Sequence, residues 1–517
     1  MVLAQTVAHE VGDTNKRNPH AVRWQPERVL ADAVFVGLSL FVVFVRARAL
    51  SKAGAPPGFD GGDWLGLGRG LFGDHVRPGG LAASPIIPVL IFVGVKTVGA
   101  QFTFVSFGAL LGALPGAGVY FVLRRQITAL DAALVSVLVM ACAGSGEAAS
   151  WGGYPQLLAL GLLPVAVVMA DRAFDRAKPS LAVGAGVLLL VVVLVSDFVF
   201  TFAALAAAVI VIARLPTLVG FVGWKRIGKL LVLLAAPLVL ALPLEVQILK
   251  ARIEAVLHPA GTSLVNPSAI DRINFVFSDR ALLWRIVMLA GAGALVLLWE
   301  RRFETHWRIA AGLALVGFGL TVAFGEPRLA YVLPTAAALS VTLWSPELRR
   351  LTRVPVFAVL AGIACVVQLQ AMPKTARVQA AYYQALTPSV VDAINWTRTH
   401  SDASTLIAVT PYRDGPALGW WVEGLAGRHT LTGSNLRWLH FASERATAEE
   451  AASVFASGVP TVEGLRRARA LQVDFLFIDK RWSDFQTGRV ASLRRESPHS
   501  VAFENSAVVV LSTAGLS

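Results

Sequence analysis

The sequence predicts a polytopic α-helical membrane protein with a C-terminal extracytoplasmic α/β domain. Of its 517 residues, 55% are hydrophobic and only 15% are charged. The apolar residues are gathered into blocks of about 17 to 21, the length of helix that spans the hydrocarbon core of a bilayer. After about residue 371 these blocks stop, and strand and helix patterns alternate instead.

This change of pattern divides the chain into three segments. Residues 1–28 are polar and basic, and we expect them to lie in the cytoplasm, with no cleaved signal. Residues 29–371 hold the transmembrane helices, with a long first outer loop at 46–102. Residues 372–517 form the α/β domain, which is long enough for a core of its own.

The basic loops predict how the chain crosses the membrane. If every apolar run crossed from a cytoplasmic N-terminus, five basic loops in succession would face outward, against the positive-inside bias. If the run 83–100 does not traverse the bilayer, all five become cytoplasmic. Pro85 and Pro88 at its start and Lys96 near its end favour a re-entrant or juxtamembrane helix. We therefore predict eleven crossings of a cell membrane, with the C-terminal domain outside. The twelve runs are 29–45, 83–100, 103–123, 129–146, 155–170, 181–196, 198–213, 230–246, 283–299, 307–323, 329–344 and 355–371.

The formal net charge of +13 indicates membrane lipids as partners and no nucleic acid. Lys and Arg cluster in short loops between apolar runs, where they set orientation and contact anionic headgroups. The two cysteines, Cys142 and Cys365, both lie inside apolar runs, so the sequence predicts neither a disulfide framework nor a thiolate metal site.

An acidic pair, Asp60 and Asp63, lies in the turn-rich stretch 56–64 of the first outer loop. Apolar residues in 64–72 recur at helical spacing, which predicts a short helix lying flat at the membrane surface. We expect the chemistry at this loop. The alternative is a solvated connection whose acids serve only turns.

Glu147 and Asp197 are the candidates for a second acidic position on the same side of the membrane. Asp197 lies at the tight junction between the runs 181–196 and 198–213. It either faces protein or a water-filled cavity just below the headgroups, or caps the helix 198–213.

Four basic residues on the predicted outer side are candidates for holding a lipid phosphate as a leaving group. These residues are Arg252, His258, Arg280 and Arg328. A solvated loop with local ion pairs explains Arg252, His258 and Arg280 equally well, and a snorkelling side chain explains Arg328.

The pattern after residue 372 predicts alternating strands and helices, which is typical of a small α/β domain. Strands are expected at 404–410 and 473–479, helices at 446–456, 461–471 and 486–495, and a closing hairpin at 501–512.

Paired tryptophans, Trp420 and Trp421, lie in a glycine-rich stretch of this domain. Exposed indole rings stack well on sugars, which makes the pair a candidate for acceptor contact. The alternative is packing in the core or at the membrane interface.

Several catalytic signatures do not occur in the sequence, among them Walker A, His-Glu-x-x-His, Cys-x-x-Cys and Gly-x-Ser-x-Gly. The sequence therefore argues against soluble-enzyme chemistry driven by nucleotide or zinc. No motif requires a cofactor, and a divalent metal is the one candidate.

The arrangement as a whole resembles the GT-C superfamily of integral membrane glycosyltransferases. The shared features are a basic N-terminus, one helix, a long acidic outer loop, a helix ending in the Tyr-Phe-Val-Leu-Arg-Arg of 120–125, further spans and an outer α/β domain. The stretches 151–159 and 421–428 are similar to segments of actinobacterial-type GT-C-like membrane proteins.

The resemblance implies a transferase that moves a sugar from a polyprenyl phosphate to a glycan or lipid acceptor of the cell envelope. Asp60 or Asp63 would be the base of an inverting displacement, and Glu147 or Asp197 the second acid. Two other classes compete: a transporter or flippase of a lipid-linked or small polar substrate, and a non-catalytic membrane scaffold. A transporter should tolerate loss of Asp60 and Asp63 but fail without its embedded acids, and the enzyme should show the reverse.

Overall fold

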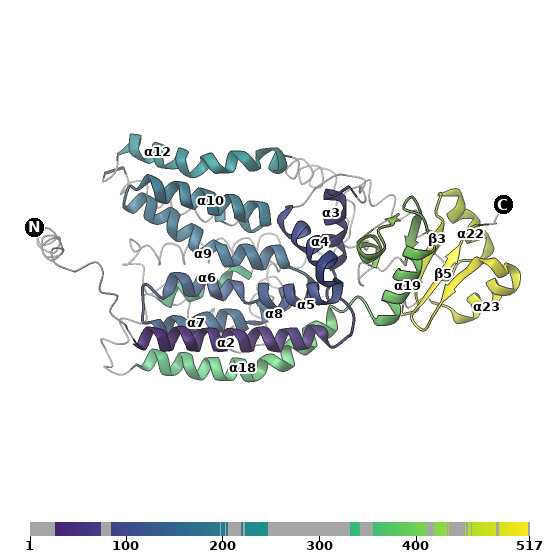
Figure 1. Ribbon diagram of the computed structural model, residues 1–517, viewed down its shortest axis with the longest axis horizontal. Coiled ribbons are helices and arrows are strands. Elements are labelled where there is room, and N and C mark those ends of the chain that lie inside the picture. The colour runs from purple at the N-terminus through teal and green to yellow at the C-terminus, as the bar shows by residue number, and fades with distance from the viewer. Residues whose placement is uncertain are drawn as a thin grey trace, which may run out of the picture.

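A bundle of long helices and a five-stranded sheet with its own helices make up the structure, and they lie end to end in Figure 1. We call the end of the bundle that faces the sheet the sheet end. The computed structural model describes residues 26–73, 84–196, 198–201, 203–204, 219–220, 223–246, 331–341, 355–410, 418–431, 433, 450, 453–455, 458–481 and 485–514.

Five helices among the described residues are long and apolar enough to cross a membrane, or six if a bent pair counts as one span. Each has an apolar stretch near the length that a bilayer core requires. The predicted runs 283–299 and 307–323 lie outside the described residues, so the number of eleven crossings stays a prediction. The five are α2 (Pro26–Ser51), α5 with α6 (Ala100–Leu111 and Leu114–Leu123), α9 (Tyr154–Asp175), α12 extended through η1 (Trp224–Ala235, Ala236–Ala241) to Val246, and α18 (Val356–Tyr382).

The bent pair consists of α7 (Ala129–Ala141) and α8 (Ala143–Trp151), which meet at 44° around Cys142. A break inside a membrane span exposes backbone carbonyls that have to find donors within the protein. Side chains of α2, α18 and α8 itself provide them. Ser145, Arg46, Gln368 and Gln379 donate to the carbonyl oxygens of Val139, Met140, Ala141 and Ala143, respectively.

Two short helices, α3 (Gly61–Leu71) and α4 (Ile86–Val98), lie at the sheet end and run across the direction of the long helices (Figure 1). With 13 residues, α4 is about 20 Å long and shorter than the roughly 30 Å core of a bilayer. This length favours the prediction that 83–100 does not traverse the membrane, which stays a prediction. The short helix predicted in the first loop is present as α3, and its position at the membrane surface stays a prediction.

The sheet has the strand order β2-β1-β3-β5-β4. β1 is parallel to β2 and β3, and β5 is antiparallel to β3 and β4. The strands are β1 (Leu406–Val409), β2 (His429–Thr430), β3 (Phe475–Asp479), β4 (Val501–Glu504) and β5 (Val508–Ser512). The helices around them are α19 (Pro388–Thr399), α20 (Leu418–Trp421), η4 (Val422–Ala426), α22 (Val462–Ala470), α23 (Thr487–Glu496) and η6 (Pro498–Ser500).

These elements coincide with the predicted strands at 404–410 and 473–479, the predicted helices at 461–471 and 486–495, and the closing hairpin. The helix predicted at 446–456 lies mostly outside the described residues. Two boundaries differ from the prediction. The helix α18 continues past 371 to Tyr382, and the predicted outer segment 147–154 is helical as far as Trp151.

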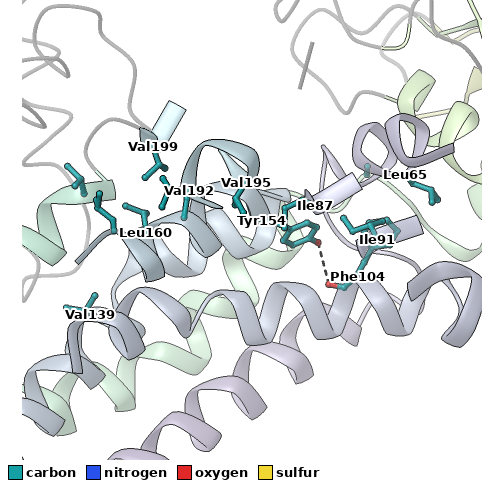
Figure 2. Close-up of a cluster of buried hydrophobic side chains, with 14 of the residues drawn as sticks. Leu65, Ile87, Ile91, Phe104, Val139, Tyr154, Leu160, Val192, Val195 and Val199 are labelled. Atoms are coloured by element: carbon teal, nitrogen blue, oxygen red, sulfur yellow. Dashed lines mark hydrogen bonds between the residues drawn. The ribbon is translucent and has the colours of Figure 1, made fainter. Parts of the chain in front are cut away.

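One hydrophobic core runs from the bundle into the sheet. Figure 2 shows its central part, where Leu65 of α3, Ile91 of α4 and Phe104 of α5 lie close to the bundle helices. The same cluster includes Phe477 of β3, whereas its neighbour Leu476 packs in a second cluster on the other face of the sheet, with residues of α22 and α23. This is the alternation of faces expected along a strand, and it ties one face of the sheet to the bundle.

The bundle helices α9 and α10 (Pro179–Val195) contribute to the same core through Leu160, Val192 and Val195 (Figure 2). Leu65 of α3 and Ile87 and Ile91 of α4 belong to the same cluster. The first outer loop is therefore anchored by burial of apolar surface, at about 25 cal/mol for each Å² removed from water.

Candidate functional site

Three segments that are distant in sequence meet at the sheet end of the bundle. They are the loop 55–60 before α3, the turn 151–154 between α8 and α9, and the segment 418–426 that forms α20 and η4. Asp60 of the predicted acidic pair lies on the first of these segments and Asp63 follows it in the first turn of α3, so this junction is the candidate site.

Backbone hydrogen bonds fix the acidic loop to the α8–α9 turn. The amides of Phe59 and Asp60 both donate to the carbonyl oxygen of Trp151, at 2.9 and 3.0 Å. The indole N–H of Trp64 donates to the carbonyl oxygen of Gly152 at 2.7 Å. Gly152 has a φ of +102°, and a Cβ there would lie 3.4 Å from the Cβ of Asp60. A glycine is therefore needed for the turn and for the close approach of the loop.

Asp60 is the N-cap residue of α3, and Asp63 lies in its first turn. Both side chains are half-buried. The N-terminal end of a helix carries partial positive charge, which stabilises an ionised carboxylate. An ionised carboxylate is the form that accepts a proton. Asp60 also lies within electrostatic range of the Tyr154 hydroxyl, which itself donates to the carbonyl oxygen of Phe104 at 3.4 Å (Figure 2).

Glu147 reaches the same end of the bundle on α8. It precedes Trp151 by one helical turn, so the two side chains share a face of the helix. Its carboxylate accepts a hydrogen bond of 2.6 Å from the hydroxyl of Tyr383. The structure therefore brings Asp60, Asp63 and Glu147 to one end of the bundle.

Trp421 is a packing residue, which corrects its prediction as an acceptor contact. It is 0% exposed, its indole N–H donates to the carbonyl oxygen of Gly58 at 3.2 Å, and its ring meets that of Phe104 edge-on. A buried ring offers no face to a sugar. Trp420 is half-buried and its amide donates to the carbonyl oxygen of Gly433. Its contact with an acceptor stays a prediction.

The other predicted site residues, Asp197, Arg252, His258, Arg280 and Arg328, lie outside the described residues. The neighbour of Asp197 bears on its alternative role as a helix cap. The hydroxyl oxygen of Ser196 accepts the amide of Val199 at 3.3 Å, so Ser196 already supplies a cap at this junction. Within the described ranges, no group of three or more His, Cys, Asp or Glu could hold a metal ion, and the divalent metal stays a prediction.

Sequence reasoning missed several residues that build this junction. Tyr383 binds Glu147, and Gln384 pairs with Gly58 through its backbone and donates from Nε2 to the carbonyl oxygen of Pro56 at 3.2 Å. Arg69 joins α3 to η4 by donating to the carbonyl oxygen of Gly424 at 2.6 Å. No local pattern marks these residues, because each partner is distant in sequence.

The apolar helices and the attached sheet define a multi-pass membrane protein, and its fold is that of solved structures with the GT-C fold. No protein-family model matches the sequence, and no curated protein matches it either.

Three solved structures of two GT-C glycosyltransferases resemble this one. ArnT from Cupriavidus metallidurans bound to undecaprenyl phosphate has a TM-score of 0.56 and 14% identity, over 94% of this chain and 98% of that chain. Its apo state has a TM-score of 0.59 and 13% identity, over 93% and 98%. The arabinofuranosyltransferase AftD from Mycobacteria has a TM-score of 0.57 and 16% identity, over 94% of this chain but only 40% of that chain. At these identities the likeness shows the fold.

Proposed function

We propose that this protein is a membrane glycosyltransferase that moves a sugar from a polyprenyl phosphate to a glycan or lipid acceptor of the cell envelope. The observation that carries the proposal is the gathering of Asp60, Asp63 and Glu147 at the sheet end of a GT-C-fold bundle. The structure of ArnT with undecaprenyl phosphate supports the choice of donor. The sheet end faces the outside of the cell in this proposal, as the basic loops predict.

Asp60 acts as the base in the proposed reaction. A Cβ at Gly152 would lie 3.4 Å from the Cβ of Asp60, which places Asp60 beside the α8–α9 turn, and Asp63 is the alternative base. The carboxylate takes the proton of an acceptor hydroxyl, whose oxygen forms a bond to the anomeric carbon. The bond from that carbon to the phosphate oxygen breaks on the opposite face, and its electron pair leaves with the phosphate. A single displacement of this kind inverts the anomeric centre.

Other predicted residues and the sheet are proposed to hold the leaving phosphate and to contact the acceptor. Arg252, His258, Arg280 and Arg328 are the proposed holders of the leaving phosphate, since cationic donors stabilise developing negative charge. Glu147 is the second acid, which orients the acceptor by accepting a hydrogen bond. The sheet and Trp420 lie beside the site and are the proposed contacts of the acceptor.

Binding of the lipid phosphate alone provides the first test. Purified protein in nanodiscs is titrated with undecaprenyl phosphate, and its thermal unfolding is followed, because a ligand that binds the native state raises the unfolding temperature. We expect stabilisation by undecaprenyl phosphate at concentrations at which phosphatidic acid, a lipid with the same type of headgroup, has no effect. Equal effects of both lipids would contradict a dedicated site.

Transfer is then measured with radiolabelled sugars on undecaprenyl phosphate and an acceptor fraction extracted from cell envelopes. The proposal expects one sugar to move to the acceptor with release of undecaprenyl phosphate. A flippase would instead move the labelled lipid between leaflets and leave the sugar attached. Movement without release would overturn the proposed function.

A further inference from the structure

Tyr383 contacts both Glu147 of α8 and Phe59 of the acidic loop. It directly follows α18, and its hydroxyl donates to Oε1 of Glu147 at 2.6 Å. Its ring meets the ring of Phe59 edge-on, with 5.3 Å between the centroids. Phe59 immediately precedes Asp60, and both of their amides bind the Trp151 carbonyl.

We propose that Tyr383 is a positioning residue that sets the spacing between Glu147 and Asp60. It binds the first carboxylate through its hydroxyl and holds the loop of the second through its ring. This inference rests on the proposed function, in which the two carboxylates act on the same acceptor. Small displacements of such groups lower turnover strongly, because catalysis needs them in near-attack geometry.

The backbone around Tyr383 is fixed independently of Glu147. Gln384, the next residue, pairs with Gly58 in a parallel bridge. The carbonyl oxygen of Ala385, one residue further, accepts a 2.8 Å hydrogen bond from Arg481. Arg481 in turn forms an ion pair of 2.6 Å with Asp479, whose side chain is fully buried at the end of β3. The segment that follows Tyr383 is therefore held by contacts with both the first loop and the sheet.

The chemistry of Tyr383 suits a hydrogen-bond donor. Burial and the nearby Glu147 carboxylate raise its pKa above the ordinary value, with smaller effects from the Tyr331 and Tyr382 hydroxyls. The hydroxyl is therefore protonated at neutral pH. A hydrogen bond from a hydroxyl to an ionised carboxylate is among the strong ones in proteins, so it fixes the carboxylate effectively.

The test compares Tyr383→Phe with Tyr382→Phe. Both remove one hydroxyl, but Tyr382 is 72% exposed, so it serves as the matched control. We expect Tyr383→Phe to lower kcat for sugar transfer about tenfold while the KM for the polyprenyl-phosphate sugar stays unchanged. Tyr382→Phe should behave as the wild type. An unchanged kcat in Tyr383→Phe, or equal losses in both variants, would overturn the inference.

A second measurement tests the contact without any substrate. Unfolding equilibria in mixed micelles are determined for Tyr383→Phe, Glu147→Leu and the double variant. If the two side chains bind each other, the loss of stability in the double variant should be smaller than the sum of the losses in the two single variants. We expect the difference to correspond to about a tenfold change in the unfolding equilibrium constant. Strict additivity would overturn the contact. If the wild type transfers no sugar but the two changes are coupled, the proposed function fails and the pairing of Tyr383 with Glu147 stands.

Discussion

The amide of Asp60 donates a hydrogen bond to the carbonyl oxygen of Trp151 at 3.0 Å. This bond uses only backbone atoms, so this link between the loop and the α8–α9 turn does not depend on the carboxylate. Replacing the side chain of Asp60 should therefore leave the loop in place. The chemistry of the acid can be tested separately from the fold that holds it.

Gly152→Ala should displace the acidic loop. The residue has a φ of +102°, and its new Cβ would lie 3.3 Å from the amide nitrogen of Gly61 and 3.4 Å from Asp60. We expect a loss of about 1–3 kcal/mol in the free energy of unfolding, together with a loss of transfer activity. Denaturant unfolding and the transfer assay measure the two effects.

Gly73→Ala is the control for this change. Gly73 also has a positive φ, of +77°, but a Cβ there meets no atom of the described residues within 4 Å. Gly73→Ala should therefore lose only about 1 kcal/mol in the free energy of unfolding, which is the cost of a positive φ for alanine, and transfer activity should be kept. Equal losses of activity in the two variants would show that the contact at Gly152 is not what positions the loop.

Trp421→Phe should destabilise the junction between the first loop and the segment 418–426. The change removes the indole N–H and leaves the carbonyl oxygen of Gly58 without this buried donor. Loss of such a bond costs about 1–3 kcal/mol in the free energy of unfolding. In Trp420→Phe, which keeps the amide bond to Gly433, stability should change by less, and a raised KM for the acceptor alone would support its predicted contact.

Cysteine labelling tests the predicted topology. Gln126 lies beyond the end of α6 away from the sheet, and Ala403 lies just before β1, and both are exposed. We expect Ala403→Cys to react with a membrane-impermeant maleimide in intact cells and Gln126→Cys to react only after permeabilisation. Cys142 and Cys365 are buried and should stay unreactive in the parent protein. Labelling of both new cysteines from the same side would refute the topology.

Local periodicity was sufficient to predict the elements that carry the site. The helix α3, the short α4, the strands β1 and β3 and the closing hairpin all appear near their predicted positions. Each is defined by apolar spacing within one stretch of chain, which is the information that periodicity contains. The helix α18 continues past the predicted boundary at 371 to Tyr382, because the change of composition marks where apolar residues end and not where the helical hydrogen bonds end.

The contacts that assemble the site could not be predicted in this way. Tyr383 and Glu147 are separated by 236 residues, and Trp421 and Gly58 by 363. The sequence made Trp421 a candidate for acceptor contact, but the glycines around it allow backbones to approach closely instead. A Cβ at Gly424 would lie 2.7 Å from the carbonyl oxygen of Gly62. Which surface a glycine-rich segment meets is a property of the assembled fold.

The central claim is that a carboxylate of the first loop is the base of a sugar transfer. It is tested most directly by single-turnover transfer from a radiolabelled undecaprenyl-phosphate sugar, with wild type, Asp60→Asn and Asp63→Asn compared at saturating donor. We predict that Asp60→Asn binds undecaprenyl phosphate as the wild type does but transfers sugar about 10² to 10⁴ times more slowly, since the amide cannot accept the proton. A loss in Asp63→Asn alone would move the base to Asp63. Wild-type rates in both variants would contradict the claim.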